Sequence, residues 1–149
     1  MLTQPRYVQP TKSDEVFSRL LAWLARHGLS VYGTRLLAVR GRSSGALRTT
    51  VVNVLEVDGA RFLVAPRGAT QWVRNVRAAG DAELRVGRRH DHVEVRELAD
   101  AEKGPVLRAY LARWGWEVGR FFEGVSRTAT DDELAAIAPG FPVFAVTSR

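Results

Sequence analysis

The chain has 149 residues and a mass of 16.5 kDa, so it is long enough for one domain with its own hydrophobic core. Its composition, 46% hydrophobic and 26% charged, excludes a disordered chain, and the absence of cysteine excludes disulfides, thiolate catalysis and cysteine-ligated metal sites. The net charge is +6, and all of the 22 basic residues except Lys12 and Lys103 are arginine. Guanidinium groups match phosphate and carboxylate, so this excess indicates an anionic partner: nucleic acid, a membrane surface or a polyanionic small molecule.

The N-terminal residues predict an arm followed by a helix. Residues 1–12 are irregular, and residues 13–28 form an amphipathic pattern that Gly28 ends. Arg19 and Arg26 flank the apolar stripe, so this helix can pack on the core or lie on a membrane. No apolar run reaches the roughly 18 residues of a membrane span, and the first residues lack the apolar segment of a secretory signal. We therefore expect a cytoplasmic protein with a single domain over residues 1–149, and peripheral membrane contact stays open.

Alternating and β-branched segments predict six strands separated by turns and helices. Asp58-Gly59 is a strong hairpin signal, and residues 87–89 form the turn of a second hairpin. The expected strands span residues 35–40, 49–57, 61–65, 82–86, 90–98 and 141–147. This pattern predicts an antiparallel barrel or an α+β domain, mainly β, rather than a doubly wound parallel sheet.

Capping signals predict three further helices. Each follows a residue whose side chain can accept the first free N–H groups of a helix, namely Thr70, Asp100 and Thr130. The last of these forms a capping box with Glu133. The expected helices are residues 71–79 before Gly80, a helix from the cap Asp100 through Arg113, and a short helix that Pro139 closes. Continuation of the second helix past Gly115 to Phe122 stays open.

The first candidate site is the glycine- and serine-rich turn at residues 41–45, sequence GRSSG. Backbone N–H groups in such a turn, together with Arg42 and the nearby Arg48, can hold phosphate or carboxylate oxygens. An ordinary solvated hairpin turn accounts for the same sequence, so the turn alone does not establish a site.

Two neighbouring segments can also face a ligand. In residues 65–68, sequence APRG, Arg67 stands where a strand leaves the sheet, a common position for ligand-facing loops. In the helix over residues 71–79, Trp72 and Asn75 are three residues apart and share a face. A plain loop and a core-facing helix are the alternative interpretations.

Aromatic residues gather in the C-terminal third, and other catalytic patterns are missing. The aromatic cluster can form core, or it can roof an apolar pocket in which Tyr110 donates a proton. Its members are Tyr110, Trp114, Trp116, Phe121 and Phe122. His90 and His92 share a strand face from which Asp91 points away, so we expect no metal site. The sequence contains no serine-hydrolase elbow, phosphate-binding loop or dinucleotide fingerprint.

The order of these motifs resembles a known family. Along the chain stand GRSSG, the residues Arg48-Thr49-Thr50, Asp58-Gly59, APRG and then QWVRNVR over residues 71–77. In combination they resemble the deazaflavin-dependent nitroreductases of actinobacteria, also described as F420-dependent quinone reductases. The resemblance runs from about Arg35 to the C-terminus. It implies a split β-barrel related to flavin-mononucleotide-binding barrels, and a bound coenzyme F420, whose 8-hydroxy-5-deazaflavin ring carries a tail with a phosphate and several glutamates.

The resemblance also implies coenzyme-binding roles for four groups of residues. The turn that holds the anionic tail comprises Arg42, Ser43, Ser44, Gly45 and Arg48. The strand that runs beside the coenzyme comprises Thr49, Thr50, Val51, Val52 and Asn53. The strand end near the ring comprises Val64, Ala65, Pro66 and Arg67, and the helix that closes over the coenzyme supplies Gln71, Trp72, Val73, Arg74 and Asn75. Ser43 departs from the family, which often has a basic residue there, so one contact with the tail is lost.

The activity implied is hydride transfer from reduced F420 to a small apolar acceptor, such as a quinone, an enone or a nitro compound. The proton comes from solvent or from Tyr110. A deazaflavin carries the hydride itself, so the protein needs no metal and no nucleophile. The alternatives are a barrel that binds flavin mononucleotide and a non-catalytic carrier of F420 or a lipid-like ligand. We expect no nucleic-acid partner, because the arginines are scattered and no recognition motif occurs, whereas related barrels often form homodimers.

Overall fold

The computed structural model describes residues 34–118 and 129–149, and the side chains from 114 to 118 are outside this description. The predicted arm 1–12 and helix 13–28 therefore lie outside the described residues, as do Phe121 and Phe122. Among the helices that are described, none is both long and apolar enough to cross a membrane.

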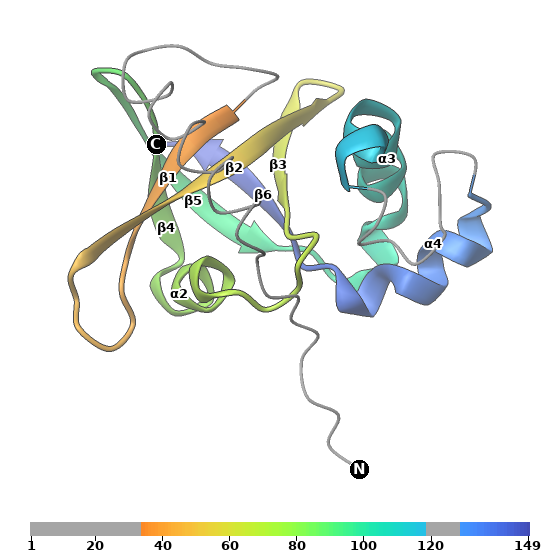
Figure 1. Ribbon diagram of the computed structural model, residues 1–149, viewed down its shortest axis with the longest axis horizontal. Coiled ribbons are helices and arrows are strands. Elements are labelled where there is room, and N and C mark those ends of the chain that lie inside the picture. Colours follow the sequence, from red (N-terminus) through yellow and green to blue (C-terminus); the bar gives the residue numbers. More distant parts are fainter. Residues whose placement is uncertain (1–33, 119–128) are drawn as a thin grey trace.

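Six antiparallel strands close into a barrel in the spatial order β1-β2-β3-β6-β5-β4 (Figure 1). The strands are β1 (Thr34–Arg40), β2 (Leu47–Val57), β3 (Ala60–Val64), β4 (Asp81–Val86), β5 (Arg89–Glu97) and β6 (Val143–Ser148). Hairpins join β1 to β2, β2 to β3, and β4 to β5, and the C-terminal β6 closes the barrel between β3 and β5. This architecture confirms the predicted antiparallel barrel.

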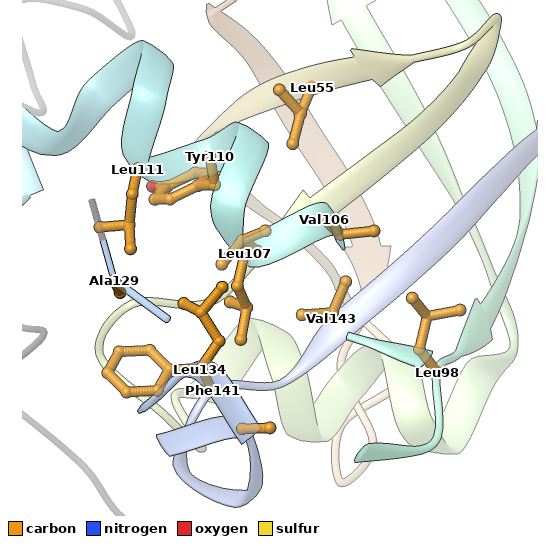
Figure 2. Close-up of a cluster of buried hydrophobic side chains, with 12 residues drawn as sticks. Leu55, Leu98, Val106, Leu107, Tyr110, Leu111, Ala129, Leu134, Phe141 and Val143 are labelled. Carbon is orange, nitrogen blue, oxygen red and sulfur yellow. The ribbon is translucent and has the colours of Figure 1, made fainter. Parts of the chain in front are cut away.

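Two hydrophobic clusters lie on opposite faces of the barrel wall. The cluster that draws on all six strands fills the interior, and we call it the barrel core; its largest members include Leu37, Leu63 and Phe144. The second, the helix-side core, lies outside the barrel under α3 (Gly104–Val118) and α4 (Asp131–Ile137), as Figure 2 shows. Strand residues alternate between the two because successive side chains point to opposite faces. On β2, for example, Val52 belongs to the barrel core and Leu55 to the helix-side core.

Helix α2 (Gln71–Ala79) lies across one end of the barrel and has the predicted limits. Val73 and Val76 on its inner face join the barrel core. Gly80 ends the helix in the left-handed conformation, with φ of 75°, and its N–H donates to the carbonyl of Val76, as the sequence predicts. The predicted cap at the other end is wrong in one respect: Thr70 holds the N-cap position, but its side chain forms no capping hydrogen bond.

The predicted helix from Asp100 begins later than the capping signal indicates. Residues Asp100–Glu102 form a short 3-10 turn, η1, and α3 starts only at Gly104. The Asp100 carboxylate is 2.7 Å from the ammonium of Lys103, which is 3% exposed and also donates to the carbonyl of Ala138 at 2.9 Å. A buried lysine needs such partners, so Asp100 pairs with Lys103 instead of capping a helix.

Other boundaries shift by one or two residues. Arg89 pairs with Val86, so the turn between β4 and β5 has two residues rather than the predicted three. Strand β6 starts at Val143 instead of at Phe141, which packs in the helix-side core after the 3-10 turn η3 (Ala138–Gly140). The capping box before α4 is confirmed: the N–H of Glu133 donates to Thr130 Oγ1, and the N–H of Thr130 donates to the Glu133 carboxylate, both at 3.2 Å.

Candidate functional site

The predicted ligand-binding turn is a compact loop between β1 and β2. The N–H of Gly41 donates to the carbonyl of Ala46 at 2.8 Å, and the N–H of Gly45 donates to the carbonyl of Gly41 at 2.9 Å. Gly45 has a φ of 71°, which side chains disfavour, and a Cβ on Gly41 would lie 3.1 Å from Ser44 Oγ and 3.2 Å from the Ala46 carbonyl. Both glycines are therefore required by the geometry of the turn.

Arg42 joins this turn to helix α2. Its backbone N–H donates to Oδ1 of Asn75 at 3.1 Å, and its Nη1 donates to the same oxygen at 2.8 Å and to Oε1 of Gln71 at 2.9 Å. Asn75 is 5% exposed, so this amide is a fixed anchor inside the structure. We call the contact of Arg42 with Gln71 and Asn75 the Arg42 junction. It brings together three of the predicted site residues from segments about thirty positions apart.

The junction orients a positive charge without neutralising it. Both partners of the guanidinium are neutral amides, and Arg42 forms no ion pair with any described residue. The sequence explains why, because no aspartate or glutamate occurs from residue 34 to 55 or from 59 to 80. The Arg42 side chain is exposed, and its two hydrogen bonds to the amides both come from Nη1. The three N–H donors of Nε and Nη2 and the full charge therefore remain for the surface beside α2.

Further arginines surround the junction at the same end of the barrel, which we call the Arg42 mouth (residues 40–48 with α2). Arg40, Arg48 and Arg74 are all exposed, and within the described residues none of them forms an ion pair. On the walls of the barrel, by contrast, Arg61 and Arg85 face carboxylates at 2.8 and 2.7 Å. On α2 itself, Arg77 is paired with Glu97 at 2.7 Å. The Arg42 mouth is therefore a basic surface that an anionic ligand can neutralise.

Thr70 adds a polar atom that the protein itself does not satisfy. Its Oγ1 is buried and has no hydrogen-bond partner within the described structure. It stands at the N-terminus of α2, where free backbone N–H groups favour a negatively charged ligand. Buried hydroxyls are normally hydrogen-bonded, so this atom is suited to bind a ligand oxygen. The sequence marked Thr70 only as a cap.

The remaining predicted residues divide between the surface of the turn and the interior. Ser43, Ser44, Gly45 and Thr49 are exposed, while Thr50, Val51 and Asn53 are half-buried, with Asn53 accepting a hydrogen bond from Thr34 Oγ1 at 3.0 Å. Val52, Ala65 and Val73 belong to the barrel core and Val64 to the helix-side core. The side chains of these four residues support the site by packing, and only their backbone can face a ligand.

Trp72, Pro66 and Arg67 lie beside the end of β3. Trp72 is half-buried and packs on Phe144 in the barrel core, with ring centroids 5.7 Å apart, so it does not join Asn75 at the Arg42 junction. Pro66 and Arg67 are half-buried in a tight turn, in which the N–H of Gly68 donates to the carbonyl of Ala65 at 3.1 Å. This turn leads directly to Thr70 and the start of α2.

Tyr110 lies apart from the Arg42 mouth. It is 2% exposed and packs in the helix-side core with neighbours that include Leu107 and Leu111 (Figure 2). Figure 1 shows α3 on one side of the barrel, and the turn between β1 and β2 with α2 on the other. The other members of the predicted aromatic cluster have no described side chains. On the described part of the chain, no three histidine, cysteine or acidic residues gather in a way that could hold a metal.

The fold belongs to the split β-barrel class, and solved structures of low sequence identity share it. A chain described only as a domain-swapped dimer is 18% identical, with a TM-score of 0.58 over 92% of this chain and 100% of that one. An F420-H2 dependent reductase is 20% identical, with a TM-score of 0.54 over 77% and 94%. A putative pyridoxamine 5'-phosphate oxidase from Listeria innocua is 11% identical, with a TM-score of 0.50 over 88% and 91%.

Within that class the sequence itself identifies the family. Residues 25–130 match the F420H(2)-dependent quinone reductases, and the chain belongs to this family. No curated protein shows significant similarity to it. Membership implies an oxidoreductase that depends on coenzyme F420. The Arg42 mouth fits this coenzyme, because its oriented guanidinium, its exposed arginines and the unsatisfied hydroxyl of Thr70 are suited to a polyanionic tail.

Proposed function

We propose that this protein transfers a hydride from reduced coenzyme F420 to a small apolar acceptor, such as a quinone, an enone or a nitro compound. The Arg42 junction is the observation that carries this proposal. A guanidinium that two neutral amides orient keeps its full charge for a ligand. The phosphate and glutamates of the F420 tail are such a ligand, and no acidic residue of the surrounding segments competes for the arginines.

In this proposal the tail binds across the Arg42 mouth. Arg42 and Arg48 contact its anionic groups, and the exposed Ser43 and Ser44 of the turn add hydrogen bonds. Thr70 Oγ1, which has no partner within the described structure, donates to a tail oxygen at the start of α2. Ser43 stands where the family often has a basic residue, so Arg48 takes a larger share of the charge.

The ring is placed against the end of β3. The backbone of residues 64–67 leaves the sheet there, next to α2, and the side chains of Val64 and Ala65 are anchored in the two cores. A rigid strand end of this kind can hold a planar ring in one orientation and exclude water from one of its faces. When bound, the reduced coenzyme supplies the hydride from carbon 5 of its ring.

The proton that completes the reduction comes from solvent in this proposal. Tyr110, the alternative donor, is 2% exposed inside the helix-side core and lies away from the Arg42 mouth. A group buried in this way has no path to an acceptor at that mouth. The residues of the chain therefore bind, orient and shield, and they need not supply an acid.

Titration with two coenzymes tests the proposal. Oxidised F420 and flavin mononucleotide are added separately, and quenching of the four tryptophans is followed. We expect tight binding of F420 alone, followed by oxidation of reduced F420 when a naphthoquinone is added. Binding without turnover on quinone, enone and nitro acceptors would instead indicate a carrier. Tight binding of flavin mononucleotide alone would contradict the choice of coenzyme.

A further inference from the structure

Helix α2 makes two polar contacts, one on each side of its buried face. Asn75 is joined to Arg42 of the β1–β2 turn, and Arg77 is joined to Glu97, the last residue of β5. Val76 stands between Asn75 and Arg77 in the sequence and packs in the barrel core. Successive helical residues leave the axis about 100° apart, so Asn75 and Arg77 lie about 100° on either side of Val76. A rotation of α2 about its axis therefore moves both contacts at once.

The contact between Arg77 and Glu97 has the geometry needed to fix this rotation. Nε of Arg77 donates to Oε1 of Glu97 at 2.8 Å, and Nη2 donates to Oε2 at 2.7 Å. Two parallel hydrogen bonds between a guanidinium and a carboxylate define an orientation as well as a distance, which a single hydrogen bond does not. Both side chains are partly exposed, so the pair adds little to the free energy of unfolding. Its larger effect is on the orientation of α2.

Glu97 stands on a rigid part of the barrel wall. It pairs across β5 and β6 with Phe144, and the side chains of such a pair share one face of the sheet. Phe144 packs in the barrel core and contacts Trp72 of α2, with ring centroids 5.7 Å apart. The Gly80 carbonyl accepts from the N–H of Val95 at 3.0 Å, which keeps the end of α2 beside β5. Glu97 therefore gives the helix a fixed point of reference on the barrel.

We infer that Arg77 and Glu97 form a positioning pair for the coenzyme site, an inference that rests on the proposed F420-dependent function. By fixing the rotation of α2, the pair sets where Oδ1 of Asn75 lies and so which way the Arg42 guanidinium points. The charges of Arg77 and Glu97 already satisfy each other, so neither residue needs to contact the coenzyme. Their effect reaches the F420 tail through Asn75 and Arg42.

The sign of the effect on F420 affinity separates positioning from long-range electrostatics. Glu97→Gln removes a negative charge, which by long-range attraction alone would tighten the binding of the anionic tail. If the pair positions α2, Glu97→Gln and Arg77→Gln should both weaken F420 binding, by about two- to fivefold, the range that a partly exposed ion pair supports. In turnover with a naphthoquinone, the KM for reduced F420 should rise by the same factor at unchanged kcat. Tighter binding by Glu97→Gln would overturn the inference.

A second ion pair of the same length is the matched control. Arg85 and Glu83 are 2.7 Å apart and partly exposed, but both belong to β4. Arg85→Gln and Glu83→Gln should change F420 affinity only through their charge, slightly and in opposite directions. The exchanged double variant, Arg77→Glu with Glu97→Arg, restores an ion pair and should recover most of the lost affinity. An exchanged variant that binds F420 no better than the two single variants would overturn the inference.

Nuclear magnetic resonance of the free, ¹⁵N-labelled full chain tests the positioning without the coenzyme. We expect Glu97→Gln to shift the side-chain amide signals of Asn75 and the Nε–H signal of Arg42, and Glu83→Gln to leave them in place. If the unaltered protein bound no F420, the proposed function alone would fail, because these signals would still report on the pair. Unchanged Asn75 signals in Glu97→Gln would overturn the positioning role, whether or not F420 binds.

Discussion

The Arg42 mouth and the barrel wall formed by β3, β6 and β5 both contain arginines, but these arginines are held in opposite ways. At the Arg42 mouth the guanidinium is oriented by the neutral amides of Gln71 and Asn75. On the barrel wall, Arg61 of β3 is held by the carboxylate of Asp91 of β5. An amide fixes the direction of an arginine and leaves its charge, whereas a carboxylate fixes the direction and cancels the charge. The partner of an arginine, and not its exposure alone, therefore decides whether it can bind an anion.

Removing the charges of Arg42 and Arg48 together should have the largest effect on F420 affinity. The double substitution Arg42→Gln and Arg48→Gln should weaken F420 binding by on the order of 100-fold or more, because each hydrogen bond to a charged group is worth roughly 1.5–3 kcal/mol. Tryptophan quenching measures the affinity, and thermal unfolding measures the fold. The double substitution Arg88→Gln and Arg96→Gln, at exposed positions on other parts of the barrel, is the control with the same net charge. An unchanged affinity would contradict the proposal that the F420 tail binds at Arg42 and Arg48.

Replacing an amide partner of Arg42 by a carboxylate, the kind of partner that Arg61 has, should have the second-largest effect on F420 affinity. Asn75→Asp replaces the amide with a carboxylate of the same shape, so Arg42 would keep its position and lose its available charge. We expect F420 affinity to fall about tenfold while the free energy of unfolding changes little, since the new pair offsets its own desolvation. Asn75→Ala removes the orientation as well and serves as the comparison. If Asn75→Asp bound F420 as tightly as the native chain, the contrast between amide and carboxylate partners would fail.

Removing the unsatisfied hydroxyl of Thr70 at the start of α2 should have two smaller effects: a gain in the stability of the free protein and a loss of F420 affinity. Thr70→Val removes the buried Oγ1 and keeps the shape of the side chain. The free protein should become slightly more stable, by up to about 1 kcal/mol, because an unpaired buried polar group is costly. The affinity for F420 should fall several-fold if this hydroxyl binds the tail. Thermal unfolding with and without F420 measures both changes, and a gain in affinity would contradict the role given to Thr70.

The Arg61–Asp91 ion pair should have the smallest effect, a contribution to stability that depends on pH. The pKa of Asp91 is lowered in the folded state, so its contribution is present above the pKa of an unfolded aspartate, about 3.9, and is lost as the pH falls through the lower folded value. Asp91→Asn should therefore destabilise the protein at neutral pH by less than about 1 kcal/mol, since the pair is partly solvated. Urea unfolding at several pH values should show this difference narrowing in acid. A constant difference would indicate a packing effect instead.

Much of the local structure could be predicted from the sequence, because its causes are local. The limits of α2 follow from Thr70 and Gly80, and the box of Thr130 with Glu133 opens α4 as expected. Asp100 could not be placed in the same way. Its carboxylate binds Lys103, whose burial depends on the distant Ala138 carbonyl, so a tertiary contact determined where α3 begins.

The candidate site shows the same division. The sequence shows the turn at 41–45 and its glycines. It also shows that the surrounding segments contain arginines but no aspartate or glutamate. The contact between Arg42 and Asn75, 33 positions apart, the unsatisfied Thr70 hydroxyl and the remote burial of Tyr110 cannot be seen there. The sequence by itself determined the strands, the hairpins, the motif order and the excess of arginine, because each depends on neighbouring residues or on composition. The tertiary structure decided which arginines meet amides and which meet carboxylates. Packing of α2 brings Gln71 and Asn75 to Arg42, and closure of the barrel brings Arg61 of β3 to Asp91 of β5.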